Sequence, residues 1–140
     1  MVDELSFHVR YAETDQMGRA YYAWYLVWFE MGRSSLMRQA GMSYAELEKR
    51  GVFLPVKRAE LHYEKAVHYD ELIKVRTWIR KHGPARVIFA SEILTEAGET
   101  ACRGEVELAV TDASGKITRW PEDALKIVSS SHEKTAEENV

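Results

Sequence analysis

The chain has 140 residues and a formal net charge of −3, and 46% of its residues are hydrophobic. This length fits one domain that can bury a sizeable core. The net charge gives no general attraction to phosphate polymers, so nucleic-acid binding is not expected. No stretch approaches the roughly 20 apolar residues of a membrane span, and the first ten residues lack a signal-peptide pattern. We therefore expect a soluble, cytoplasmic protein.

The sequence also argues against a metal or prosthetic group. Cys102 is the only cysteine, which excludes an internal disulfide and any zinc site built on two or more cysteines. The five histidines show no close metal-ligand spacing. Cys102 itself lies in an alternating strand without an adjacent histidine, so we interpret it as a core thiol and not as a nucleophile.

The first third of the chain predicts a strand followed by two helices. Residues 6–11 alternate loosely and end before a turn at residues 13–18. Residues 24–40 contain no proline and are apolar on every side in their first half, which predicts a helix buried at its N-terminal half and ended by Gly41. Ser43 and Glu46 form a capping-box pattern that predicts a second helix, running to about residue 50.

Most of the remainder has the pattern of antiparallel strands separated by turns rich in Gly, Pro and Asp. The expected strands cover residues 52–65, 71–81, 86–96 and 100–111, with a short one at 116–120. Residues 121–128 then predict a short helical turn that ends the domain, and residues 129–140 a polar, disordered tail. One apolar helix and a long sheet with one dry face predict a two-layer α+β domain of five to six strands, in which the sheet curls around the helix.

One stretch suggests chemistry. Asp15 and Gly18 stand directly before an aromatic, helix-forming segment that includes Tyr22, Tyr25 and Trp28. A helix N-terminus has unpaired N–H groups and a partial positive charge that favour developing negative charge on a ligand, while a carboxylate nearby can act as a nucleophile or base. An aspartate in such a turn can also simply accept a hydrogen bond from the backbone two residues on.

With these residues the chain resembles the hotdog-fold acyl-CoA thioesterases of the 4-hydroxybenzoyl-CoA thioesterase and Tol-Pal-associated thioesterase type. The resemblance extends from the Asp15 to Phe29 motif to residues 56–63, 69–75 and 115–121. It implies a hotdog fold, in which a curved antiparallel sheet wraps a long central helix. It also implies hydrolysis of an acyl-CoA thioester to a free acid and coenzyme A, without a cofactor.

The resemblance also implies roles for residues. Asp15 would be the nucleophile or general base, Gly18 would shape its turn, and the backbone N–H of Tyr22 would stabilise the oxyanion. Tyr25 and Trp28 either pack in the core or line an acyl pocket. The basic group Arg80, Lys81 and Arg86 either binds the coenzyme A phosphates or forms a solvated hairpin end.

Several alternatives stay open at this point. Glu30 could serve as a second base, or it could be a polar-face residue paired with Arg33. The domain could bind an acyl-CoA without catalysis, as a sensor or carrier, or it could be an interaction protein. The family places each active site between two subunits, so the resemblance implies a homodimer or homotetramer. The acyl group, aromatic or aliphatic, is not determined by the sequence.

Overall fold

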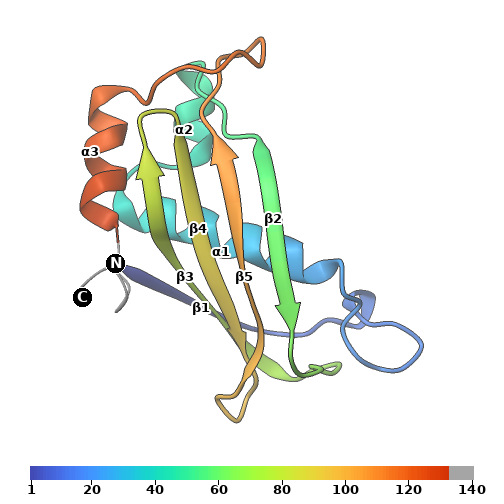
Figure 1. Cartoon of the computed structure of the whole chain (residues 1–140). Coiled ribbons are helices and arrows are strands. Elements are labelled where there is room, and N and C mark those ends of the chain that lie inside the picture. The colour runs from blue at the N-terminus through green and yellow to red at the C-terminus, as the bar shows by residue number, and fades with distance from the viewer. Residues whose placement is uncertain (133–140) are drawn as a thin grey trace.

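A five-stranded antiparallel sheet forms one layer of the molecule in the computed structural model, which describes residues 1–132 (Figure 1). The strands lie in the order β1-β3-β4-β5-β2. Their bounds are β1 Val2–His8, β2 Val56–Tyr63, β3 Leu72–Gly83, β4 Arg86–Leu94 and β5 Thr100–Ala109. Three α-helices accompany them, α1 Trp24–Ala40, α2 Tyr44–Lys49 and α3 Glu122–Ser131, with a 3-10 turn at Tyr11–Glu13.

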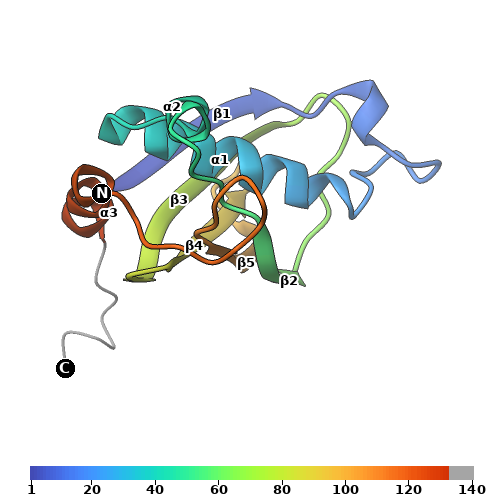
Figure 2. The ribbon, with the colours of Figure 1, turned by 90° about the horizontal axis from the view of Figure 1, so that it is seen from above.

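Helix α1 lies along the concave face of the sheet, which curves around it (Figure 2). Alternate side chains of β3 face the helix, and together with the buried stripe of α1 they form the core. The largest fully buried side chains include Trp28, Phe29, Leu36, Ile79 and Phe89. This is the two-layer α+β arrangement of a hotdog fold, as the sequence predicted.

Gly32 allows the helix to approach the sheet closely. A Cβ atom at this position would lie 2.3 Å from Thr77 Oγ1 and 3.0 Å from Val75 Cγ1. Both neighbours belong to β3 and are fully buried, so neither can move freely. The missing side chain therefore allows α1 to lie at this short distance from the sheet.

The helix bounds follow local signals. Helix α1 covers the predicted residues 24–40, and Gly41 ends it with a φ of 101°, a left-handed conformation that glycine adopts at low cost. Ser43 Oγ accepts a hydrogen bond from the Glu46 backbone N–H at 3.2 Å, which confirms the predicted N-cap of α2. The prediction that the first half of α1 is buried was partly wrong, because Leu26 and Val27 are each 42% exposed.

Several other predictions differ from the structure, including the expected strand at residues 52–65, of which only Val56–Tyr63 form β2. The first strand spans residues 2–8 and not 6–11, because pairing with β3 begins at Val2 and residues 11–13 form the 3-10 turn. Residues 116–120 form no strand, although Ile117 makes an isolated bridge with Thr111 and the Thr118 N–H donates to the Val110 carbonyl at 2.9 Å. Helix α3 continues to Ser131, beyond the predicted domain end at residue 128. The predicted tail falls from residue 133 onward outside the described residues.

Strand β2 is an open edge of the sheet. It pairs with β5 on one side only, and nearly all of its residues are exposed. Such an edge presents unpaired backbone N–H and C=O groups that can pair with another strand. Within residues 1–132, no helix is long and apolar enough to cross a membrane.

Candidate active site

The loop that carries Asp15 is closed by backbone hydrogen bonds. Thr14 bridges to Ala20, and the Asp15 N–H donates to the Arg19 carbonyl at 2.9 Å. Gly18 turns the chain with a φ of 78°, in the left-handed region that favours glycine. The loop is therefore a defined turn that brings residue 20 back beside residue 14.

One oxygen of the Asp15 carboxylate is held by its own loop. Oδ1 accepts a hydrogen bond from the Met17 backbone N–H at 2.8 Å. This is the local turn bond expected of an aspartate in such a sequence. Within residues 1–132 no donor contacts Oδ2, and the side chain is only partly buried. The turn bond therefore orients the carboxylate and leaves one oxygen available for chemistry.

The turn that leads into α1 contains a free backbone donor, the N–H of Tyr22. Trp24 is the first helical residue, and its N–H donates to the Tyr21 carbonyl at 3.0 Å. Tyr22 stands two residues before the helix, in the turn that leads into it. Its N–H finds no acceptor among the described residues. A free N–H beside a helix N-terminus is suited to stabilise an oxyanion.

A hollow of about 370 Å³ brings these groups together. Asp15 and Tyr22 border it, with Tyr25 and Tyr63 forming an aromatic wall. The rings of Tyr25 and Tyr63 meet edge to face, with centroids 5.1 Å apart. Burial raises the pKa of Tyr25 to about 12, so its phenol stays protonated and cannot serve as a base at neutral pH. The remaining lining residues are Met17, Arg19, Ala20, Glu64, Lys65 and Ala66.

Asp15 also borders a wider hollow of about 660 Å³ on the other side of its loop, together with Gly18 and Tyr69. Tyr22 does not line that space. The smaller hollow is therefore the better candidate for a reaction that needs both the carboxylate and the Tyr22 N–H.

Tyr63 was missed from the sequence. Its hydroxyl donates to the Tyr22 carbonyl at 2.9 Å, so the end of β2 is tied to the turn before α1. Arg19 and Lys65 were also missed, although both are cations at the hollow. Lys65 forms an ion pair with Glu99. The sequence places Tyr63 at the end of a strand, but no neighbouring residue indicates which turn its hydroxyl contacts.

Trp28 packs behind Tyr25, with ring centroids 4.9 Å apart, and does not line the hollow. It is fully buried, and its indole N–H donates to Glu13 Oε2 at 2.8 Å. The structure therefore places Tyr25, but not Trp28, at the same hollow as Asp15.

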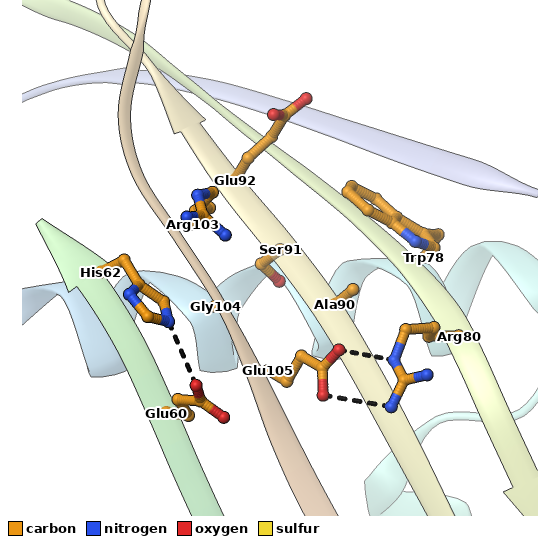
Figure 3. Close-up of a pocket in the computed structure, with 10 residues that line it drawn as sticks. All are labelled: Glu60, His62, Trp78, Arg80, Ala90, Ser91, Glu92, Arg103, Gly104 and Glu105. Atoms are coloured by element: carbon orange, nitrogen blue, oxygen red, sulfur yellow. Dashed lines mark hydrogen bonds and ion pairs between the residues drawn. The ribbon is translucent and has the colours of Figure 1, made fainter. Parts of the chain in front are cut away.

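The three basic residues of the β3–β4 hairpin are not brought to Asp15 within one chain. The hairpin turn lies at the end of the sheet opposite to the loop before α1 (Figures 1 and 2). Arg80 lies on the outer face of the sheet, where its Nη2 donates to Glu105 Oε2 at 3.2 Å (Figure 3). Arg86 Nε lies 3.7 Å from Glu107 Oε2, and Lys81 is exposed.

The outer-face hollow around Arg80 is lined by charges that pair with one another. Figure 3 shows His62 beside Glu60, with Nε2 and Oε1 3.1 Å apart, on the side of the hollow opposite to Trp78. The acidic and basic side chains of this hollow are therefore largely neutralised by neighbouring residues and do not point toward one common position.

Two other candidates from the sequence lie outside the site. Glu30 is exposed and accepts a hydrogen bond from Ser34 Oγ at 3.1 Å, and it does not line the hollow of Asp15. Cys102 is fully buried, which confirms the core interpretation, and burial raises the pKa of its thiol to about 12. Residues 1–132 contain no cluster of three or more His, Cys, Asp or Glu side chains that could hold a metal ion.

A comparison with protein families shows which family the chain resembles over most of its length. The model of the thioesterase-like superfamily matches residues 9–128, which include the Asp15 loop, all of α1 and all but the first strand of the sheet. The chain belongs to the thioesterase-like superfamily. This membership confirms the resemblance seen in the sequence and makes the protein a thioester hydrolase.

Individual relatives agree with the family. YneP of Bacillus subtilis strain 168, named as a candidate acyl-CoA thioesterase, is 41% identical over 102 residues, which cover 73% of this chain and 74% of YneP. Among solved structures, a DHNA-CoA thioesterase from Staphylococcus aureus is 34% identical with a TM-score of 0.88, covering 92% of this chain and 89% of that one. Protein TT1821 from Thermus thermophilus is 30% identical with a TM-score of 0.89, covering 96% and 100%.

Proposed function

We propose that this thioesterase hydrolyses an acyl-CoA thioester to a free carboxylic acid and coenzyme A, with Asp15 as nucleophile or general base. The backbone N–H of Tyr22 would stabilise the oxyanion. The observation that carries the proposal is the shared hollow, which is bordered by a carboxylate with one free oxygen and by the residue whose N–H has no acceptor within residues 1–132. The cytoplasmic location expected from the sequence stays a prediction.

The two routes differ in what attacks the thioester carbon. In the base route, Asp15 takes a proton from water, and the hydroxide adds to the carbonyl carbon. The tetrahedral adduct then collapses with cleavage of the C–S bond, and the departing coenzyme A thiolate takes up the proton. In the nucleophile route, Asp15 Oδ2 adds directly, and loss of the coenzyme A thiolate leaves a mixed anhydride that water then hydrolyses. Both routes place a negative charge on the carbonyl oxygen at the tetrahedral stage, where the Tyr22 N–H and the positive end of α1 stabilise it.

The proposed substrate class agrees with the relatives and with the site. The names of YneP and of the S. aureus enzyme specify CoA thioesters for those proteins. The aromatic wall of Tyr25 and Tyr63 can pack against an acyl group, and the Arg19 cation at the same hollow suits an anionic phosphate. The proposal requires no metal or prosthetic group, since Asp15 and water supply the chemistry.

We also propose a homodimer formed through β2. The open edge of this strand can pair with the same strand of a second copy, which would join two sheets around a two-fold axis. Tyr63 ends β2 and borders the hollow, so such pairing would bring the second copy beside the site. In sedimentation equilibrium, the protein should have two or four times its monomer mass of 16.1 kDa, as a homodimer or as a homotetramer built from such dimers; a monomer at micromolar concentration would refute this assembly.

Asp15→Asn tests the catalytic role. Asparagine keeps an Oδ1 that can accept the Met17 N–H, so the loop should survive while the carboxylate is lost. We expect the release of free thiol from a panel of acyl-CoA substrates to fall by at least ~10²-fold.

Asp112→Asn is a matched control. Asp112 Oδ1 accepts the Ser114 N–H at 2.9 Å in the same kind of turn, and this residue does not line the hollow. Its substitution should leave thiol release unchanged. Near-wild-type turnover by Asp15→Asn would contradict the proposed mechanism. Measurable binding of acyl-CoA by the wild-type protein, with no thiol release from any substrate, would instead support a sensor or carrier.

A further inference from the structure

Glu13 carries a buried carboxylate that has no role in the proposed reaction. Its side chain is only 2% exposed. Oε1 accepts the Arg10 backbone N–H at 2.7 Å, and Oε2 accepts the Trp28 indole N–H at 2.8 Å and Arg10 Nη2 at 3.4 Å. A buried carboxylate requires such donors, because its desolvation is otherwise very unfavourable.

These bonds connect two segments that are distant in sequence. Glu13 ends the 3-10 turn at residues 11–13, and Trp28 lies in the second turn of α1. The indole is fully buried among the core side chains, so its N–H is a fixed point. The carboxylate of Glu13 therefore fastens the chain just before the Asp15 loop to the body of the helix.

The backbone of Glu13 makes a second connection. Its carbonyl accepts the Tyr21 N–H at 2.8 Å, directly before the proposed oxyanion donor Tyr22. Asp15 follows Glu13 by two residues. One residue thus contacts the helix core, the turn that carries Tyr22, and the segment that leads into Asp15.

We propose that Glu13 is a positioning residue, which holds the Asp15 carboxylate and the Tyr22 N–H at their working separation by anchoring both segments to Trp28. This inference rests on the proposed roles of Asp15 and Tyr22. Misplacing a reacting group by about 1 Å can lower a rate by about 10²-fold, so an anchor of this kind affects turnover without touching the substrate. Glu13 does not line the hollow, which fits an indirect role.

Glu13→Gln tests the proposal with little change in volume. The amide keeps one acceptor oxygen and replaces the other with an NH₂ donor, so either the Arg10 N–H or the Trp28 N–H loses its acceptor. At a temperature where the variant is fully folded, we expect kcat for acyl-CoA hydrolysis to fall by at least about tenfold. KM should change by less than about threefold, because the groups that line the hollow remain.

Two controls separate positioning from stability. Glu48→Gln makes the same chemical change at an exposed residue of α2 and should leave kcat unchanged. Val128→Ala removes buried volume from α3, away from the site, and should lower the unfolding midpoint without lowering kcat of the folded protein. A wild-type kcat in folded Glu13→Gln, whether KM stays unchanged or rises, would overturn the proposal.

A double variant gives a readout that a merely structural role would not produce. Because Glu13 is proposed to hold Asp15 and the Tyr22 N–H at one separation, Glu13→Gln should lower thiol release by a smaller factor in an Asp15→Asn background than in the wild-type protein, where both groups act. An equal factor in the two backgrounds would overturn the inference. If Glu13→Gln does not fold, Trp28→Phe removes the indole donor instead, and a wild-type kcat in that variant would equally overturn it.

The two proposals can fail separately. An active Asp15→Asn variant would refute the proposed role of Asp15 whatever Glu13 does. An inactive Asp15→Asn variant together with a fully active Glu13→Gln variant would refute only the positioning role.

Discussion

Gly32→Ala is expected to destabilise the fold by forcing α1 away from the sheet. The new Cβ would lie 2.3 Å from Thr77 Oγ1, a contact that real side chains do not make, and 3.0 Å from Val75 Cγ1. Thr77 is fully buried, and its hydroxyl is within hydrogen-bond distance of Ser91 Oγ at 3.1 Å. The hydroxyl can therefore move aside only by breaking that bond.

The size of the effect follows from three contributions. Breaking a buried hydrogen bond costs about 1–3 kcal/mol, and the remaining crowding against the Val75 methyl costs about 1–3 kcal/mol as overpacking. Alanine offsets about 1 kcal/mol of this, because it favours a helix interior more than glycine does. We expect the free energy of unfolding to fall by about 3 kcal/mol.

Urea denaturation followed by circular dichroism measures this change, with the m-value expected to stay constant. Gly83→Ala is a control, because the nearest atom to its new Cβ is the Arg86 Cγ of a flexible side chain, at 3.2 Å. Thr77→Ala should partly rescue Gly32→Ala, since it removes the clashing hydroxyl and leaves the Thr77 Cβ position at an ordinary 3.5 Å. Strictly additive effects, or a stable Gly32→Ala variant, would refute this account of the helix position.

Two further predictions concern the site wall and the far end of the sheet. Tyr63→Phe removes the hydrogen bond to the Tyr22 carbonyl, so the free energy of unfolding should fall by about 0.5–1.5 kcal/mol and kcat should fall a few-fold, whereas a wild-type kcat would show that this bond does not support the oxyanion turn. Burial, together with the neighbouring His132, lowers the pKa of His82 below its ordinary value of 6.5. The unfolded chain therefore binds a proton more readily, so the contribution of His82 to stability is present above about pH 6.5 and is lost as the pH falls toward the folded-state pKa. Urea denaturation should show that lowering the pH from 7.5 to 5.5 reduces the free energy of unfolding less in His82→Gln than in the wild type. Equal reductions in the two proteins would contradict this.

Part of the site could be predicted because it depends on neighbours in sequence. The Asp15 turn is closed by bonds among residues 14–20, and Gly18 supplies the left-handed conformation that the turn needs. The start of α1 could be placed near Tyr22 from the aromatic run alone. The resemblance then assigned chemistry to these residues, and the family comparison confirmed the fold and the class of enzyme.

The anchors of the site could not be predicted in the same way. Nothing near Glu13 indicates that its carboxylate is buried, because its donor Trp28 is 15 positions away. The contact of Tyr63 with Tyr22 spans 41 positions and arises only when β2 packs beside the start of the helix. The contact of Arg80 with Glu105 likewise spans 25 positions and follows from the sheet register.

The bounds of α1, the cap of α2 and the alternation of the main strands could be read from local patterns, because periodicity, caps and turn residues act within a few positions. Three other outcomes depend on tertiary packing: the hydrogen bond of Trp28 to Glu13, the absence of a strand at residues 116–120, and the exposure of Leu26 and Val27. These outcomes depend on which surfaces meet when the sheet curves around the helix. Long-range packing of this kind has no local signature, since the partners lie far apart along the chain.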